Sequence, residues 1–530
     1  MKAKVALLGL AGIMLAACNK PATPTLTEWV STTYENPWQT LSLEGVTSDT
    51  TANTIEIDPT LTAHTIDVFG TCFNELGWAS LKVLSDEQLS EIFSEMFEPG
   101  KGANFLRGRM SIGANDFALD YYSCDDTDGD FELKDFSIER DKQNIIPMIK
   151  WAQKYQPNLL MWASPWCPPK WMKLHGKHYA ERAVTPEIIA QREKRMKEMM
   201  AKREAEAKKQ AEAQGIKPGE QGGVSATSGF FTQGALAFRM EPRVNDAVPG
   251  EEGFENVTSF NMDPKYLDAY ARYFGKFVDA YKAEGIPVTR VMPQNEPNSA
   301  QPYPSCSWTS KDLNTFVGKY LGPEMEKHGI EVYFGTVERA DYLKVDTLLQ
   351  DPDSKKYIKG VGFQWAGKDA LPKIHELYPN LTMVQSEQEC GNGQNNWEGA
   401  MHSWDLMKHY LGNGVNEYYY WNTSLFEGKA STWGWHQNSL ITVKEEDKTY
   451  KWTPEYYTIK HASHYVLPGA RYLNIAGSYS DAMAFVNSDG SVVVLAANQT
   501  EEAQPVTIKL AGKAQTVVLP AKSLNTFVLK

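Results

Sequence analysis

Short apolar runs alternate with amphipathic segments through most of the chain. The apolar runs have the length of buried strands, and the segments between them carry apolar side chains at the spacing of a helix. One such segment begins after Ser85, with Gln88 three residues later, which is the pattern of a helix-capping box. This alternation predicts a parallel α/β barrel. The predicted strands include residues 105–110, 158–166 and 288–292, and the predicted helices include residues 86–97, 142–155 and 266–284.

The pattern changes near residue 470. Short runs of alternating apolar and polar residues, separated by Gly, Asn and Asp turns, predict an antiparallel β-sandwich. Residues 55–69 also alternate like strands, with Asp58–Pro59 predicted as a break between them. We assign residues 66–465 to the barrel and residues 466–530 to the side domain.

A leader segment is predicted at residues 1–17, where two lysines precede an apolar run that is short for a membrane span. The ending Leu15–Ala16–Ala17–Cys18 resembles a bacterial lipobox. This implies a lipid anchor at Cys18, contact with a membrane, and location in the bacterial cell envelope. The alternative is an ordinary signal peptide with a coincidental cysteine. Residues 18–40 are polar, with several Pro and Thr, and predict a tether.

Residues 178–255 are predicted to be an insertion in the barrel. Within it, residues 185–213 are dense in charge and have few apolar anchors, which is typical of a solvated helix. The alternative is a lid or a substrate-guiding arm over the barrel rim. Residues 215–253 are rich in Gly and weakly patterned.

The net charge of −13 disfavours nucleic acid as a partner, because phosphate contacts need a basic surface. Besides Cys18, the cysteines are widely spaced and form no C-x-x-C pair, so we expect neither a zinc site nor a disulfide framework. We expect no metal, no cofactor and a monomer. The 15 Trp and 25 Tyr residues suit contact with sugar rings, although many can be core residues.

Two predicted strands end in a carboxylate. One leads into Asn295–Glu296–Pro297, where the proline cannot donate to a sheet, and the other ends at Glu387. In a parallel barrel, catalytic groups lie at the rim formed by the carboxyl ends of the strands. Glycoside hydrolysis needs one carboxylic acid to protonate the leaving oxygen and a second carboxylate to attack the anomeric carbon or activate water. For Glu296 the alternative is an exposed side chain in a turn.

Several motifs carry a resemblance to a known family. They occur in order as FGTCFNELGW (69–78), RMSIGANDFALDYYSCDD (109–126), LLMWASPWCPPKWMK (159–173), MPQNEPNSAQPYPSC (292–306), QSEQECGNG (385–393) and YYYWN (418–422). With them the chain resembles glycoside hydrolase family 30, the family of glucocerebrosidase and of bacterial and fungal β-1,6-glucanases. The resemblance implies a (β/α)8 TIM barrel with a side antiparallel β-sandwich, to which residues 41–65 add strands, and a retaining mechanism.

The resemblance also implies roles for individual residues. The family's acid/base corresponds to Glu296 and its nucleophile to Glu387. Asn295 would hydrogen-bond the sugar 2-hydroxyl and the nucleophile. Arg109 would hold the nucleophile ionised, and Asp116 would bind sugar hydroxyls. For Arg109 the alternative is an ordinary salt bridge in the barrel.

Four tryptophans are candidates for sugar contact. The resemblance implies that Trp166 and Trp421 wall the subsite of the cleaved sugar and that Trp365 binds substrate, with core packing as the alternative. Trp433 lies in a loop that faces the same rim and could stack on a sugar outside the cleaved position. Ala366 stands where glucocerebrosidase-like members have a tyrosine, which argues against assuming a glucosylceramide substrate.

Glu389 is an alternative nucleophile, although the Ser–Glu pattern at the strand end favours Glu387. Glu389 would then be a binding or supporting carboxylate. The segments at residues 363–367 (FQWAG) and 386–393 (SEQECGNG) resemble the β-1,6-glucanase branch, so we predict a retaining endo-β-1,6-glucanase acting on a β-glucan. The alternatives are a β-glucosidase or glucosylceramidase, a β-xylanase, and a surface lipoprotein that binds glycan without cleaving it.

Overall fold

A computed structural model describes residues 24–180, 190, 193–194, 197–198, 201 and 257–530. The predicted leader, the lipid anchor at Cys18 and most of the insertion at 178–255 lie outside these residues. In the part of the chain that is described, no helix combines the length and the apolar content that a membrane span requires.

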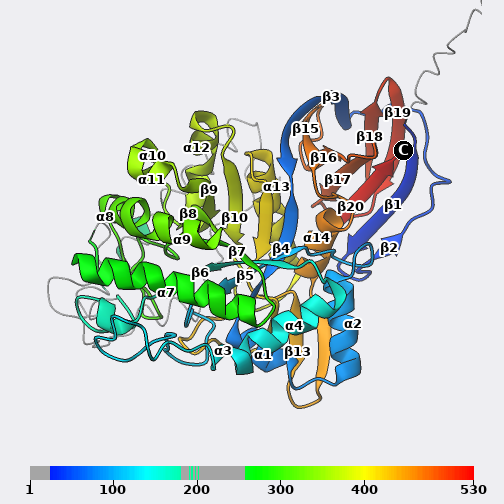
Figure 1. Cartoon of the computed structure of the whole chain (residues 1–530). Coiled ribbons are helices and arrows are strands. Elements are labelled where there is room, and N and C mark those ends of the chain that lie inside the picture. The colour runs from blue at the N-terminus through cyan, green and yellow to red at the C-terminus, as the bar shows by residue number, and fades with distance from the viewer. Residues whose placement is uncertain (1–23, 181–189, 191–192, 195–196, 199–200, 202–256) are drawn as a thin grey trace, which may run out of the picture.

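Eight parallel strands close into a barrel (Figure 1). Each strand pairs with the next one along the chain, and β11 pairs with β4 to complete the ring. Their apolar side chains share one large core with the surrounding helices. The predicted TIM barrel is therefore confirmed. Its strands are β4 (Val68–Phe73), β5 (Arg107–Ser111), β6 (Leu160–Ser164), β7 (Val288–Val291), β8 (Glu331–Val337), β9 (Ile358–Gln364), β10 (Thr382–Glu387) and β11 (Glu417–Tyr420).

Helices lie outside the barrel strands. The helix α2 (Asp86–Phe97) has the predicted capping box, because the Ser85 side chain accepts from the Gln88 amide while the Gln88 side chain accepts from the Ser85 amide. The long helix α7 (Pro264–Ala283) buries one aromatic face before strand β7. The remaining described helices are α1 (Glu75–Leu81), α3 (Asp141–Asn144), α4 (Ile146–Tyr155), η1 (Lys170–Met172), α8 (Ser310–Phe316), η2 (Val317–Leu321), α9 (Gly322–His328), α10 (Leu343–Gln350), α11 (Pro352–Lys355), η3 (Trp365–Asp369), α12 (Leu371–Leu377), α13 (Trp397–Gly412) and α14 (Pro454–Ser463).

A second sheet stands beside the barrel, where the first and last strands of the chain meet (Figure 1). Its order is β19-β18-β3-β15-β16-β17-β20-β1-β2, and its strands are antiparallel except for the pair β18 and β3. It has a hydrophobic core of its own. The predicted side β-domain is confirmed, and a small third sheet lies at the barrel rim. The strands are β1 (Leu26–Thr33), β2 (Gln39–Thr40), β3 (Thr54–Ile66), β12 (Ser424–Phe426), β13 (Ile441–Lys444), β14 (Thr449–Trp452), β15 (Ala470–Ala476), β16 (Ala482–Val486), β17 (Val492–Asn498), β18 (Gln504–Leu510), β19 (Lys513–Leu519) and β20 (Ser523–Leu529).

The prediction of a tether over residues 18–40 is wrong for Leu26–Thr33, which form β1. This strand pairs with β20, and the Trp29 indole donates to the Asn525 side chain at 3.0 Å. The partner residue lies 496 positions away along the chain. Local composition carries no signal for so distant a pairing, which is why a polar segment of this kind resembles a linker.

The predicted break at Asp58–Pro59 is also wrong, because β3 continues through it. The proline lies where the pairing of β3 with β15 shifts register, between Ile57 and Thr62. Its missing N–H therefore removes no ladder hydrogen bond. The Asp58 carboxylate accepts from the Thr60 amide at 2.9 Å, which gives the irregular stretch a local hydrogen bond.

Charged side chains tie three barrel strands together near the beginning of β11. Glu417 lies 2.6 Å from a guanidinium nitrogen of Arg107 on β5 and 2.9 Å from one of Arg290 on β7. The Glu417 and Arg290 side chains are almost fully buried. These contacts hold the three strands at a fixed separation, which also fixes where their carboxyl ends lie.

Candidate active site

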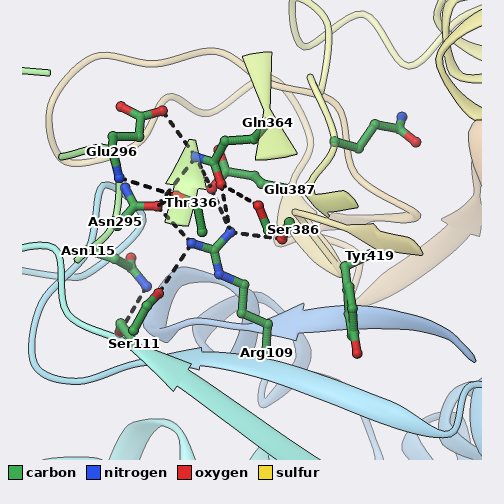
Figure 2. A network of polar contacts seen from close by, with 12 residues as sticks. Arg109, Ser111, Asn115, Asn295, Glu296, Thr336, Gln364, Ser386, Glu387 and Tyr419 are labelled. Atoms are coloured by element: carbon green, nitrogen blue, oxygen red, sulfur yellow. Dashed lines mark hydrogen bonds and ion pairs between the residues drawn. The ribbon is translucent and has the colours of Figure 1, made fainter. Parts of the chain in front are cut away.

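Barrel strands bring polar side chains together at one rim (Figure 2). Strand β5 supplies Arg109, β9 ends at Gln364 and β10 ends at Glu387, while Asn295 and Glu296 follow β7. The ends of parallel strands in a closed barrel face the same side. The two carboxylates predicted from the sequence therefore meet in one hydrogen-bond network.

Arg109 is the centre of this network. Its side chain is fully buried, and one guanidinium nitrogen lies 2.8 Å from Glu387 Oε2 and 2.9 Å from the carbonyl oxygen of Ser386. The other nitrogen donates to Asn295 Oδ1 at 2.7 Å. Aromatic rings exclude water around the cation and so strengthen these contacts. The guanidinium carbon lies 4.9, 4.6 and 5.1 Å from the ring centroids of Trp162, Trp166 and Trp421.

Three donors fix the orientation of Asn295. Its Oδ1 atom accepts from Arg109, from the Thr336 hydroxyl at 2.8 Å and from Gln364 Nε2 at 3.3 Å. A guanidinium cannot accept a hydrogen bond, so the amide oxygen must face Arg109. The Asn295 NH₂ group is thereby left to donate to another acceptor.

Glu296 has an unusual backbone conformation. Its φ is +47°, in the left-handed region that residues with a side chain seldom adopt. Its amide donates to the Thr336 hydroxyl at 3.2 Å. Its carboxylate accepts from the Tyr303 hydroxyl at 3.2 Å and from Gln364 Nε2 at 3.1 Å. Backbone strain held in this way is typical of functional sites.

Glu387 accepts three hydrogen bonds. Besides Arg109, they come from Gln364 Nε2 at 3.2 Å and from the Trp365 indole at 3.2 Å. Burial raises the pKa of Glu387 to about 7; the charge of Arg109 opposes this rise and that of Glu296 adds to it.

Two side chains that donate to the carboxylates, Gln364 and Tyr303, were missed by the sequence-based predictions. Gln364 is fully buried and its amide contacts both carboxylates. It stands at a strand end directly before Trp365, which is a signal that could have identified it. Tyr303 lies in the loop after Glu296 and shows no pattern that separates it from a core tyrosine.

Asp116 is close to the carboxylate pair. Burial, with the charges of Glu387 and Glu296, raises its pKa well above the usual range. Its Oδ1 atom is buried and has no hydrogen-bond partner among the described residues. A buried polar atom of this kind is costly unless a ligand or water satisfies it.

The candidate tryptophans occupy different places. Trp166 and Trp421 stack with ring centroids 5.2 Å apart and both face Arg109. Trp365 is partly exposed and also has a positive φ, of +47°. Trp433 packs edge-on against Tyr121, 5.2 Å between ring centroids, rather than on the carboxylate network.

Glu389 is bound to other groups. Its carboxylate lies 2.6 Å from Lys368 Nζ and 3.5 Å from His402 Nε2. Burial acts to raise its pKa, but the hydrogen bond to His402 and the charge of Lys368 bring that pKa down to about 2. Lys368 also donates to the carbonyl oxygen of Trp365, so this cluster supports the η3 turn.

Among the residues described, no group of three or more His, Cys, Asp or Glu side chains is arranged to hold a metal ion. The five cysteines from Cys72 to Cys390 are buried free thiols.

The sequence matches models of a known protein family over most of its length. A model of the glycosyl hydrolase family 30 TIM-barrel domain matches residues 66–187 and 246–466, and a model of the family's beta sandwich domain matches residues 469–527.

Two curated relatives and one solved structure cover most of the chain. The lysosomal acid glucosylceramidase of Mus musculus is 24% identical over 79% of this chain and 72% of its own length. An endo-1,6-beta-D-glucanase of Aspergillus fumigatus is 24% identical over 90% of this chain and 87% of its own. The solved structure of an endo-beta1,6-glucanase has a TM-score of 0.70 and 21% identity, and covers 94% of this chain and 98% of that one.

Proposed function

Because the chain belongs to glycosyl hydrolase family 30 and is a glycoside hydrolase, we propose that it cleaves a β-1,6-linked glucan internally and with retention of anomeric configuration. Glu296 is the acid/base and Glu387 the nucleophile. The observation that carries the proposal is the pair of rim carboxylates bound to one amide nitrogen, that of Gln364.

The spacing of the carboxylates supports retention. One nitrogen lies 3.1 Å from an oxygen of Glu296 and 3.2 Å from an oxygen of Glu387, so these oxygens are no farther apart than the sum of the two distances. Retaining enzymes have carboxyl groups about 5–5.5 Å apart, whereas inverting enzymes need roughly 6.5–9.5 Å for a water molecule. This limit on one oxygen–oxygen distance favours the retaining arrangement over the inverting one.

The distribution of donors supports the two roles. Glu387 faces a guanidinium, an indole N–H and an amide, whereas Glu296 faces a hydroxyl and the same amide. The cation beside Glu387 stabilises the anion that a nucleophile must be, so we assign the negative charge to Glu387 and the catalytic proton to Glu296. Glu296 donates this proton to the glycosidic oxygen while Glu387 attacks the anomeric carbon. Water activated by the ionised Glu296 then hydrolyses the glycosyl-enzyme.

Around the pair, Asn295 offers its NH₂ group to the sugar 2-hydroxyl, and Asp116 accepts from a further hydroxyl. Trp166, Trp365 and Trp421 form the walls of the subsite. The Glu389 carboxylate is held by Lys368 and His402, which argues against it as nucleophile. Trp433 remains a candidate for contact with a more distant sugar through its loop.

The choice of a β-1,6-glucan draws on the endo-1,6-glucanases among the relatives and on Ala366. A tyrosine at position 366 is a feature of the glucocerebrosidase-like members, and this chain lacks it. The second candidate function is that of a glucosylceramidase or a β-glucosidase, because some relatives of the chain are named glucosylceramidase.

The test of substrate is hydrolysis of β-1,6-glucan, β-1,3-glucan, xylan, glucosylceramide and an aryl β-glucoside, with product sizing. Short β-1,6-oligosaccharides of mixed length are expected. Release of single glucose units from the aryl glucoside or the ceramide alone would replace the proposal with the second candidate. Proton NMR of the first product should show the β-anomer before mutarotation, and an initial α-anomer would contradict retention.

Variants with added azide test the two roles. In Glu296→Ala, azide should restore turnover of an activated aryl glucoside and yield a β-glycosyl azide, because it attacks the glycosyl-enzyme in place of water. In Glu387→Gly, azide should replace the missing nucleophile and yield the α-glycosyl azide. The opposite stereochemistry in the two variants would reverse the assignment.

We also propose that Cys18 carries the lipid anchor and that the protein is held at the bacterial cell envelope. The support is the lipobox-like sequence at Leu15–Cys18. Wild-type protein is expected in the membrane fraction and Cys18→Ala in the soluble fraction of the same cells. Equal membrane association of the two would refute the anchor.

A further inference from the structure

Gln364 lies within hydrogen-bond distance of both carboxylates and of Arg109 and Asn295 (Figure 2). Its side chain is fully buried at the end of β9, so substrate does not reach it. Whatever it contributes, it contributes through its neighbours.

The orientation of the Gln364 amide is fixed. Its Oε1 atom lies 3.4 Å from an Arg109 nitrogen and 3.0 Å from the Ser386 hydroxyl. Because a guanidinium donates and cannot accept, the amide oxygen must face Arg109. The NH₂ group therefore points to the carboxylates and cannot exchange places with the oxygen.

Two N–H groups then meet three acceptors. Nε2 lies 3.1 Å from Glu296, 3.2 Å from Glu387 and 3.3 Å from Asn295. The Asn295 oxygen already accepts from Arg109 and Thr336 at shorter distances. The two hydrogens are thus directed mainly to the two carboxylates, one hydrogen for each.

We propose that Gln364 is a positioning residue of the carboxylate pair: its amide nitrogen fixes their separation and donates a hydrogen bond to whichever of them carries the negative charge. The inference rests on the function proposed above. Before the reaction the anion is Glu387. In the glycosyl-enzyme Glu387 is an ester and Glu296 is the anion. One neutral donor serves both states without moving.

A glutamine suits this place because it stays neutral at every pH. An additional carboxylate would repel both carboxylates of the pair, and an apolar side chain would remove one hydrogen-bond donor from each of them. The variants Gln364→Met and Gln364→Glu therefore separate the loss of the donor from the addition of a charge.

The first test needs no substrate. Infrared difference titration of carboxyl groups in the full-length protein is expected to place the pKa of the pair about one unit higher in Gln364→Met than in wild type, because each anion loses a donor. A larger upward shift is expected in Gln364→Glu. An unchanged titration in both variants would overturn the inference, even if the substrate were assigned wrongly.

The second test uses whichever glycan the enzyme cleaves. In Gln364→Met we expect kcat to fall roughly 10²-fold, KM to change less than threefold, and both limbs of the pH profile of kcat/KM to move upward. A change confined to KM would show that Gln364 serves substrate binding instead and would also overturn the inference.

Gln388 provides a matched control. It is a buried glutamine in the same part of the barrel, and it bonds to Ser403 and Tyr418 instead of the carboxylates. Gln388→Met is expected to lower thermal stability while leaving both limbs of the pH profile in place. If Gln364→Met fails to fold, Gln364→Asn, which withdraws the amide by one methylene, should give the same direction of shift. Equal shifts in the Gln388 variant would indicate general disruption and refute the specific role.

Discussion

At the scale of single residues, Asp116 offers the most direct access to substrate binding. Its buried Oδ1 atom lacks a partner among the described residues, and a sugar hydroxyl would satisfy it. Asp116→Ala should lower kcat/KM by roughly 10- to 100-fold, mostly through KM, since a buried hydrogen bond to a sugar hydroxyl is lost. Steady-state kinetics on soluble β-1,6-oligosaccharides would measure this.

A buried aspartate with internal partners gives the control for that experiment. Asp141 accepts from the hydroxyls of Tyr122 and Tyr281. Asp141→Ala should reduce thermal stability and leave kcat/KM of the folded fraction near that of wild type. Similar kinetic losses in both variants would remove the case for Asp116 as a binding residue.

Glu387 and Glu389 are expected to respond differently to the same substitution. Glu387→Gln should lower turnover at least a thousandfold, because the nucleophile is removed, whereas Glu389→Gln should cost less than tenfold. Rates on an aryl β-glucoside or a β-1,6-glucan would distinguish them. A loss of similar size in Glu389→Gln would reopen the question of which residue is the nucleophile.

Glu389 also makes the stability of the folded protein depend on pH. The folded-state pKa of Glu389 is lowered to about 2 from 4.5, so the stabilisation it provides is present above pH 4.5 and is lost as pH falls toward 2. Denaturant titrations should show a shallower loss of stability over this range in Glu389→Gln than in wild type. An equally steep loss would contradict the ion pair with Lys368.

At the scale of elements, the strands β5, β7 and β11 are joined by a buried ion cluster. Glu417→Ala leaves the guanidinium groups of Arg107 and Arg290 without their shared carboxylate. Breaking a buried pair in this way costs about 3–5 kcal/mol of unfolding free energy. Ser85→Ala, which removes only the cap of α2, should cost about 1 kcal/mol. Chemical denaturation would rank them, and equal effects would contradict the role given to the cluster.

At the scale of the whole molecule, helix α14 joins the barrel to the side sheet. Both nitrogens of His461 lie within hydrogen-bond distance of threonine hydroxyls, 2.7 Å from Thr526 on β20 and 2.9 Å from Thr32 on β1. Trp38 packs on the same imidazole, 4.8 Å between ring centroids. The first and last strands of the chain thereby meet one helix of the barrel (Figure 1).

This contact makes stability depend on pH. Burial lowers the folded-state pKa of His461 to about 3 from 6.5, so the folded protein keeps the ring neutral. The resulting stabilisation is complete above pH 6.5 and falls toward pH 3 by up to about 1.4 kcal/mol per pH unit.

His461→Gln should flatten this dependence in denaturant titrations. Part of the slope will remain, because His64, whose pKa is lowered to about 4 mainly by burial, contributes with the same sign. A slope equal to that of wild type would show that His461 is not the group responsible.

Signals between neighbouring residues were enough to predict the barrel, a helix start and the positions of two carboxylates. The alternation of apolar runs and amphipathic segments predicted the barrel, the Ser85–Gln88 pattern predicted the start of α2, and the strand-end positions of Glu296 and Glu387 predicted where carboxylates would lie. Periodicity, capping and strand ends depend on neighbouring residues, so one sequence is enough to reveal them.

The position of Gln364 and the strand β1 were decided by the closure of the barrel and by the pairing of the two chain ends. Gln364 lies between the two carboxylates because β9 stands beside β10 and near β7 in the ring, and β1 is a strand because β20 meets it from the far end of the chain. The position of Gln364 before Trp365 marks a strand end but does not say which side chains meet there, and the polar segment near the N-terminus does not indicate its partner strand. Residues that are far apart in the sequence become hydrogen-bond partners only when folding brings their strands together. These contacts are therefore visible only in the tertiary structure.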